Sequence, residues 1–351
     1  MPGLYYDESV GKFVVTHSMI KAFRGCPRQT LYKQVDRLKP KILGTPLKRG
    51  TWMHLLLEEH HSGRDWLKMH QTLSAQFAEL MDEEKDHYGD LPRECKALMD
   101  AYVWHYEADP WTVHEVEYTL EAEFPDGTLY RGKVDAIIEN QFGLWIADHK
   151  THGNLPSHTF RLLDAQSSLY LWAAGKMGIP VQGFVWNYLR TKAPSKPTML
   201  QNGSRLSKKL GDTDYLTFTR EVNRLRREEG YRVRAEDVEI SRRLKGHRYV
   251  PGEPQLSPFF RRDILEKDPE MLRRVASEAY LTTKRMAKYP FHQRDAVERN
   301  VDSFKCDRYC GYRDLCTIEL MGGNTRPLMK NFKVGDPQDY YQDRAGELRG
   351  V

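Results

Sequence analysis

The sequence predicts an α/β fold, in which a mixed sheet forms the core and helices flank it. Residues 16–110 have mostly helical periodicity, whereas strand-like patterns dominate residues 111–190. Within the second region, residues 132–138 and 144–151 form two apolar runs around a short turn, which is the pattern of a β-hairpin. A helical cap, three strands, a helix and a further strand would place this hairpin near the centre of the sheet.

Periodicity, capping residues and chain breakers predict the individual elements. Helices are expected from Thr16 or Ser18, either of which can cap, to about residue 35, and at about 47–60, 65–108 with a break near 89–92, 160–177 and 269–289. Strands are expected at 113–124, in the hairpin, at 181–189 and, as an edge strand, at 257–263.

The hairpin carries charge where apolar residues would be expected. Asp135 lies in its first strand, and Asp148 and Lys150 lie in its second. Strand side chains alternate between faces, so Asp148 and Lys150 should point the same way. A buried acid is costly unless it is paired or binds a metal ion. The pattern therefore favours a cation site with a basic partner, a layout suited to phosphodiester hydrolysis.

The register of the hairpin decides whether the two acids meet. Asp135 and Asp148 lie opposite each other only if paired residue numbers add to 283 (135 + 148). This register leaves the four-residue connection 140–143. Gly143 suits an exit position with positive φ. A five-residue loop would separate the acids unless a bulge restores them. The alternative interpretation is an ordinary hairpin with one exposed acid in each strand.

These residues resemble a known family. Gly132-x-Val134-Asp135 followed by Asp148-x-Lys150-Thr151 is similar to the core motif of the PD-(D/E)XK nuclease superfamily. Three further features resemble its RecB-like exonuclease branch: Gly50-x-x-x-His54, Gln166-x-x-x-Tyr170, and Cys26 with a C-terminal cysteine triplet. The resemblance spans about residues 16–190 and 258–317. It is closest to phage-encoded and CRISPR-associated exonucleases and to the AddB nuclease domain.

The resemblance refines the expected fold. It implies a restriction-endonuclease-like mixed sheet with an N-terminal helical cap and a C-terminal iron–sulfur segment. One elaborated nuclease domain is then expected over residues 1–322. Its parts are the cap (16–110), the catalytic core (111–190), an insertion (191–257) and a C-terminal helix with the cysteine cluster (258–322); a polar tail (323–351) follows.

The cysteines suggest a cluster-binding segment. Their number is five, which is odd and argues against a complete disulfide framework. Cys306, Cys310 and Cys316 are spaced so that their thiolates can converge, and four thiolates can hold either a 4Fe–4S cluster or a zinc ion. The residues alone do not decide between a 4Fe–4S cluster, a zinc ion and cysteines without a ligand. The resemblance implies a 4Fe–4S cluster completed by Cys26. Cys95, in an expected helix, reads as a small buried hydrophobe.

The resemblance also implies roles for the site residues. Asp135 and Asp148 would bind Mg²⁺ or Mn²⁺, because carboxylate oxygens suit hard ions. Lys150 would orient or help deprotonate the attacking water and offset charge on the phosphate. Further metal ligands are expected to be His54, Glu117 in preference to Glu115, and the carbonyl of His149. Gln166 and Tyr170 would contact the DNA backbone or hold Lys150, with plain packing as the alternative.

The expected activity is that of a metal-dependent DNA exonuclease in recombination, repair or end processing. Its expected partners are DNA, at linear ends or single-stranded regions, and recombination or CRISPR-type proteins. No G-x-x-x-x-G-K-[ST] stretch is present, which excludes a P-loop motor in this sequence. Two alternatives are a non-catalytic iron–sulfur DNA-binding or assembly factor with a nuclease-like fold, and a zinc-stapled structural protein.

Composition agrees with an intracellular nucleic-acid enzyme. The 351 residues include 54 Lys and Arg against 49 Asp and Glu, a net charge of +5 that permits nucleic-acid binding. No apolar run reaches membrane-spanning length and the N-terminus lacks a signal-peptide pattern, so we expect a cytoplasmic protein, in the host cytoplasm if it is phage-encoded. The arginine-rich insertion 191–257 reads as a solvated helix face with loops or as a DNA-contacting flap.

Overall fold

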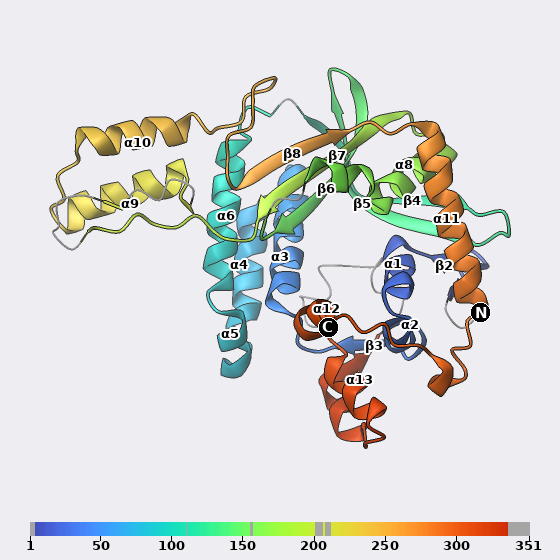
Figure 1. The fold of residues 1–351 in the computed structure, drawn as a ribbon. Helices are drawn as coiled ribbons and strands as arrows, with labels where there is room; N and C mark the ends of the chain where they lie inside the picture. The colour runs from blue at the N-terminus through green and yellow to red at the C-terminus, as the bar shows by residue number, and fades with distance from the viewer. Residues whose placement is uncertain (1–3, 110, 155–156, 201–205, 208–211, 336–351) are drawn as a thin grey trace.

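A mixed β-sheet lies at the centre of the fold (Figure 1). The structure is a computed structural model that describes residues 4–109, 111–154, 157–200, 206–207 and 212–335. Within these residues, seven strands form one sheet in the order β1-β2-β5-β6-β7-β8, with β4 also paired to β5. The strands are β1 (Tyr5–Asp7), β2 (Lys12–Val15), β4 (Thr112–Glu123), β5 (Leu129–Asn140), β6 (Gly143–His152), β7 (Val181–Arg190) and β8 (Phe260–Leu265).

Helices surround the sheet and extend beyond it (Figure 1). The α-helices are α1 (His17–Gly25), α2 (Pro27–Thr30), α3 (Thr45–His61), α4 (Trp66–Ala78), α5 (Asp82–Tyr88), α6 (Leu91–His105), α7 (His158–Leu162), α8 (Ala165–Lys176), α9 (Tyr215–Glu228), α10 (Ala235–Lys245), α11 (Pro269–Lys288), α12 (Ser303–Tyr309) and α13 (Arg313–Leu320). Shorter elements are the π-helix η1 (Leu31–Val35), the 3₁₀-helices η3 (Arg294–Ala296) and η4 (Arg326–Asn331), and the paired strands β3 (Leu38–Pro40) and β9 (Phe332–Val334).

Two large apolar cores hold the helices in place. The first joins the sheet to α1, α8 and α11, and includes Ile20, Leu169, Phe184 and Met286. The second joins α3, α4, α5 and α6 to the end of β7 and the start of β8, and includes Leu56, Met99 and Phe260. Burial of these side chains supplies the main driving force for the fold. None of the described helices has both the length and the apolar composition needed to span a membrane.

The long strand β5 organises the sheet. Along one edge it pairs with β4 in antiparallel fashion. Along its other edge, Leu129 and Tyr130 pair with β2 in parallel, whereas the stretch from Ala136 to Asn140 pairs with β6 in antiparallel fashion. The sheet is therefore mixed, and two different strands share one edge of β5. Asp135 lies just before the stretch that pairs with β6.

The hairpin register is confirmed, but its connection is shorter than expected. Ala136 pairs with Ala147 and Asn140 pairs with Gly143, so that paired residue numbers add to 283. The two ladders therefore close over the loop residues 141–142 alone, instead of the predicted four-residue connection. Gly143 has a φ of 110°, which agrees with the expected positive φ at the exit of the turn.

Three helical stretches contain breaks that were not expected. In the first, residues 79–81 separate α4 from α5, although the break expected within 65–108 was near 89–92. The helix capped by Thr16, whose side chain accepts from the Met19 N–H at 3.2 Å, ends at Gly25 because Cys26 is extended. Pro27 then starts α2, a position that tolerates its missing N–H. The helix expected at 160–177 is likewise divided into α7 and α8, because Asp164 is extended and caps α8 through the Gln166 N–H at 2.8 Å.

The insertion and the tail contain more structure than the sequence indicated. Helices α9 and α10, which we call the arm, pack on a small apolar cluster of their own that includes Phe218 and Ile240. The arm projects to the left of the body in Figure 1. In the tail expected over residues 323–351, η4 and β9 are formed, and β9 pairs with β3 near the N-terminal helices. Residues 336–351 lie outside the described part.

Close contact between β5 and α8 provides a test of this packing. A Cβ added at Gly132 would lie 2.4 Å from Cε1 and 2.7 Å from Cδ1 of Tyr170. Gly132→Ala should therefore displace the Tyr170 ring and cost about 1–3 kcal/mol, seen as a lower Tm in thermal denaturation. Gly175→Ala on α8 is the matched control, because an added Cβ there meets nothing within 4 Å. It should melt at or above the wild-type Tm, and an unchanged Tm for Gly132→Ala would contradict the packing.

Candidate active site

Four of the expected site residues converge where β5 and β6 separate. Asp135 and Asp148 are 5% and 2% exposed. His54, on α3, places its Nδ1 3.1 Å from Oδ1 of Asp135. Lys150, two residues beyond Asp148 on β6, forms an ion pair with the Asp148 carboxylate. The structure therefore joins a helix of the cap to both strands of the hairpin at one point.

The end of the β5–β6 ladder explains how Asp135 is held. The recorded pairing ends at Ala136 and Ala147, so His149 lies beyond it. Its backbone N–H donates to Oδ2 of Asp135 at 2.6 Å. A hydrogen bond from a backbone N–H to a carboxylate favours the charged form and fixes its orientation. Because His54 contacts the other oxygen, both oxygens of Asp135 are oriented.

Burial sets the charge state of the second acid. It raises the pKa of Asp148 to about 6, and the negative charge of Asp135 acts in the same direction. The positive charges of Lys150 and His54 oppose this rise. A raised pKa produced by burial and a like charge is typical of sites that bind a cation.

Helix α8 supplies the next layer of contacts. Gln166 places its Nε2 3.4 Å from Oδ1 of Asp148 and 3.1 Å from the Tyr170 hydroxyl. The Tyr170 hydroxyl donates to the carbonyl of Lys133 on β5 at 3.0 Å. Gln166 thus reaches Asp148, while Tyr170 is buried and connects α8 to β5. The expected contacts of these two residues with DNA stay a prediction.

Glu117 occupies an unusual backbone conformation beside the site. Its φ is 51°, in the left-handed region that non-glycine residues rarely adopt. Its neighbours on β4, Val116 and Tyr118, pair with Ala136 and Val134 on β5. Glu117 therefore lies opposite Asp135 in the adjacent strand. Its carboxylate forms an ion pair with Lys133 at 2.8 Å. Its role as a metal ligand therefore stays a prediction.

Sequence reasoning missed two charged neighbours of this region. Lys133 neutralises Glu117, and Glu58 lies one turn after His54 on α3. Burial raises the pKa of Glu58, and the charge of Glu117 raises it further, so these two acids are near each other. The spacing of four residues from His54 could have identified Glu58, since positions i and i+4 share one face of a helix.

The four cysteines expected to form a cluster come from three places in the fold: the α1–α2 break, α12 with its C-terminal end, and α13. Cys26 lies at the break between α1 and α2, Cys306 is in α12, Cys310 ends α12 and Cys316 is in α13. Burial raises the pKa of the Cys310 thiol, and the charges of the other three raise it further, so all four lie within electrostatic reach. Cys95 lies apart in α6, where burial raises the pKa of its thiol to about 12.

Donor types and present geometry both bear on whether these residues suit a metal. Two carboxylates and an imidazole are suitable donors for a hard divalent ion, and four thiols are suitable for iron–sulfur or zinc. Among the described residues, however, no group of three or more His, Cys, Asp or Glu side chains has the arrangement that could hold a metal ion as it stands. At the paired acids, His54 and Lys150 occupy the carboxylates instead.

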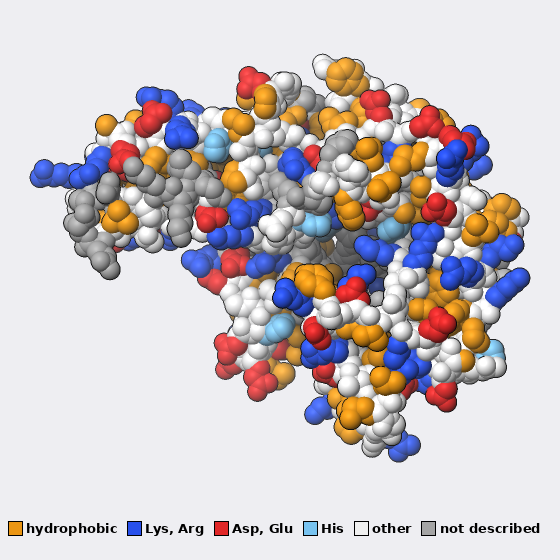
Figure 2. Space-filling model, viewed as in Figure 1, with side chains coloured by type: hydrophobic (Ala, Val, Ile, Leu, Met, Phe, Trp, Pro, Cys, Tyr) orange, Lys and Arg blue, Asp and Glu red, His pale blue; other side chains and the backbone are white. Residues whose placement is uncertain are grey.

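Basic side chains lie near the site. Figure 2 shows Lys and Arg side chains around a hollow in the middle of the displayed face. Burial lowers the pKa of His17, at the start of α1, and the positive charges of Lys21 and Lys150 lower it further. Both lysines are therefore near His17. Positive charge beside paired acids is suited to a phosphate-containing ligand.

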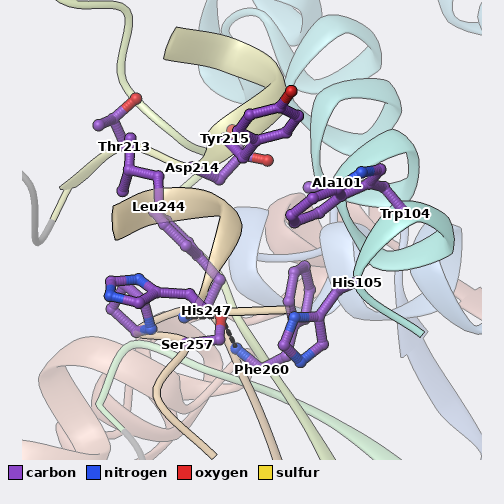
Figure 3. Close-up of a pocket in the computed structure, with 12 residues that line it drawn as sticks. Ala101, Trp104, His105, Thr213, Asp214, Tyr215, Leu244, His247, Ser257 and Phe260 are labelled. Atoms are coloured by element: carbon purple, nitrogen blue, oxygen red, sulfur yellow. Dashed lines mark hydrogen bonds between the residues drawn. The ribbon is translucent and has the colours of Figure 1, made fainter. Parts of the chain in front are cut away.

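Away from the paired acids, a pocket lies between the arm, α6 and the segment before β8 (Figure 3). Its walls are largely apolar and aromatic, and Trp104 and Tyr215 stack there with ring centroids 4.9 Å apart. The acid in its lining, Asp214, accepts from the Thr217 N–H at 2.9 Å and caps α9. The pocket therefore lies where the arm meets the body, and its lining lacks paired acids like Asp135 and Asp148.

Comparison with known proteins decides the family. A scan against protein families matches the PD-(D/E)XK nuclease superfamily over residues 14–317. The chain belongs to the PD-(D/E)XK nuclease superfamily. Nucleases of this superfamily use divalent metals such as Mg²⁺ or Mn²⁺. Membership therefore implies a metal-dependent nuclease, with DNA as the substrate that the fold suggests.

Other comparisons add little to this assignment. No curated protein matches the chain. Among solved structures, one titled "Crystal structure of SSO0001" is 12% identical, with 86% of this chain and 85% of that chain covered and a TM-score of 0.31. A TM-score of this size does not establish a shared fold, so the superfamily assignment is based on the sequence match.

The raised pKa of Asp148 predicts how metal-free stability depends on pH. Its pKa of about 6 in the folded protein lies above the ordinary aspartate value of 3.8, so ionisation is harder in the folded state. The free energy of unfolding should fall as pH rises from about 4 through about 6. In EDTA, Asp148→Asn should therefore melt above wild type at about pH 8 and lose this advantage near about pH 4.

Thermal denaturation over this pH range measures the effect. Glu253→Gln is the control, because Glu253 is an exposed loop residue. It should follow wild type at every pH. A variant of Asp148 that melts below wild type at alkaline pH would contradict the electrostatic account.

Proposed function

We propose that this protein is a metal-dependent DNA exonuclease of the RecB-like iron–sulfur branch, acting in recombination, repair or end processing. The observation that supports it best is the meeting of Asp135, Asp148 and Lys150 beside His54. The exonuclease specificity and the biological process follow from the resemblance of the motifs.

A divalent cation bound here would lower the pKa of a water molecule and polarise a phosphoryl oxygen. Asp135 and Asp148 would hold it, with His54 and the carbonyl of His149 as further ligands. Binding requires His54 to turn from Asp135 to the cation and Lys150 to give up its ion pair with Asp148. Lys150 is then freed to orient the attacking water and offset the charge that develops on the phosphate.

Gln166 would keep Asp148 in position while the substrate binds, since it reaches that carboxylate from α8. Glu117 remains our candidate for an additional ligand, provided that Lys133 moves away. Each of these roles depends on small side-chain movements, which is common when an apo site closes on its ligands.

The arm is the proposed flap over the DNA. Exposed basic side chains of the arm and of the connection between its two helices favour phosphate contact; they include Arg226, Arg227, Arg232, Arg234 and Arg243. The neighbouring acids Glu228 and Glu229 weaken the case less than the sequence suggests, because Arg224 pairs with both.

A cleavage assay tests the proposed activity. Purified protein is incubated with end-labelled linear DNA and with circular DNA, in Mg²⁺, Mn²⁺ or EDTA. We expect degradation of linear DNA only, and only with a divalent metal. Asp148→Ala should abolish it while the protein stays folded, and wild-type activity in this variant would reject the site.

Lys150→Ala separates catalysis from binding in the same assay. Its contact with the phosphate is strongest in the transition state, so kcat should fall by about 10²–10³-fold with little change in DNA affinity. A change in KM alone would make Lys150 a DNA-binding residue. DNA binding without cleavage under every condition would support the non-catalytic alternative.

The proposed 4Fe–4S cluster predicts different fates for two cysteine variants. A cluster shared by Cys26 and Cys306 closes a loop of nearly the whole chain, which by analogy with disulfides is worth about 4–5 kcal/mol. Cys26→Ala should therefore lose iron, colour and thermal stability together. Cys95→Ala is the control, because Cys95 is buried in the apolar core around α3 and α6.

Iron content, Tm and the visible spectrum measure these effects after anaerobic purification. A broad band near ~400 nm would indicate iron–sulfur, and zinc without colour would favour the structural alternative. Full iron occupancy in Cys26→Ala would show that the fourth ligand is wrong.

A further inference from the structure

A buried polar network surrounds the side chain of His149, whose backbone N–H holds Asp135. Nδ2 of Asn187, on β7, donates to Nδ1 of His149 at 2.8 Å and to the hydroxyl of Tyr102 at 2.9 Å. The same hydroxyl lies 3.1 Å from Nε2 of His61 on α3. The network therefore joins β6, β7, α6 and α3.

The ring of His149 is held from two directions. His61 stacks on it with ring centroids 5.1 Å apart and an angle of 8° between the planes. Asn187 lies beside it in the sheet, because His149 and Asn187 pair across β6 and β7. With a hydrogen bond along one edge of the ring and a stacked ring on its face, rotation of the His149 side chain is restricted.

This arrangement is costly to build. Asn187 and Tyr102 are fully buried and His149 is 3% exposed. Oδ1 of Asn187 has no hydrogen-bond partner in the described part of the chain, which makes a buried amide here unfavourable compared with an apolar residue. The neighbouring positions of β7 are filled by apolar and aromatic side chains from Phe184 to Leu189. A stabilising role alone therefore does not account for Asn187.

The hydrogen bond from Asn187 requires an acceptor on the His149 ring. Nδ2 of Asn187 can only donate, so Nδ1 of His149 accepts. A neutral imidazole offers one nitrogen as an acceptor, and Nδ1 takes that part opposite the Asn187 amide. The hydrogen bond therefore selects the tautomer and the orientation of the ring together.

We propose that Asn187 is a positioning residue that acts through His149 on the metal site. By fixing the His149 ring it fixes the peptide whose N–H orients Asp135 and whose carbonyl is a candidate metal ligand. The inference rests on the proposed function, because it assumes that Asp135 binds a divalent cation. Residues that orient ligands from behind typically change metal affinity or activity about 10–100-fold when mutated.

Asn187→Leu tests this directly, because leucine has nearly the same shape and cannot donate a hydrogen bond. We expect its affinity for Mn²⁺, measured by calorimetry and by electron paramagnetic resonance of free Mn²⁺, to fall about 10–100-fold. The KM for DNA should stay near the wild-type value, while the Mn²⁺ concentration for half-maximal cleavage should rise by a similar factor.

Val185→Ala is the matched control. Val185 lies two residues before Asn187 on β7, is 1% exposed, and packs in the apolar cluster with Trp145 and Ala147. Its truncation should lower the Tm without changing Mn²⁺ affinity. Tyr102→Phe provides a second, milder variant that keeps the ring and removes one partner of Asn187, so it should weaken Mn²⁺ binding less than Asn187→Leu does.

The outcomes separate this inference from the proposed function. If wild type binds Mn²⁺ and Asn187→Leu binds it as tightly as Val185→Ala does, the positioning role is rejected. Should Asn187→Leu fail to fold, wild-type affinity in Tyr102→Phe would reject it instead. If wild type binds no Mn²⁺ and cleaves no DNA, the proposed function fails, and the inference fails with it.

Discussion

The hydrogen bond from the His149 backbone to the Asp135 carboxylate is the contact on which the site depends. It forms where the recorded β5–β6 ladder ends, so the N–H of His149 turns to a side chain instead of a strand. This hydrogen bond satisfies a backbone donor and also fixes a buried acid. The rest of the fold supports it: α3 brings His54 to Asp135, and α8 brings Gln166 to Asp148.

Charge balance explains why two acids can be buried so close together. Lys150 pairs with Asp148, His54 contacts Asp135, and Lys133 pairs with Glu117 at the edge of the same region. Without such partners the desolvation of the acids would be prohibitive. A divalent cation would take over the contacts that His54 and Lys150 now make with Asp135 and Asp148, so the contacts that stabilise the metal-free protein also hold the acids in place for a metal ion.

The cysteines illustrate a second constraint, set by distance along the chain. Cys26 and the triplet near the C-terminus belong to segments about 280 residues apart (306 − 26), yet Cys26 is near enough to Cys310 for its charge to raise the pKa of that thiol. Strands β3 and β9 pair beside them, and Tyr32 and Tyr312 lie with ring centroids 5.5 Å apart. The N-terminal helices and the C-terminal segment are thus joined by packing that a shared cluster would reinforce.

The sequence by itself determined the local features of this protein. Alternation in the hairpin predicted its register, Thr16 its helix start, and the motif around Asp135, Asp148 and Lys150 its superfamily. Local preference also misled: the helix expected to continue past Cys26 is broken, and β9 pairs with a strand from the other end of the chain. Tertiary structure alone decided that Asn187 lies behind His149 and that Lys133 pairs with Glu117, because such contacts depend on which strands become neighbours.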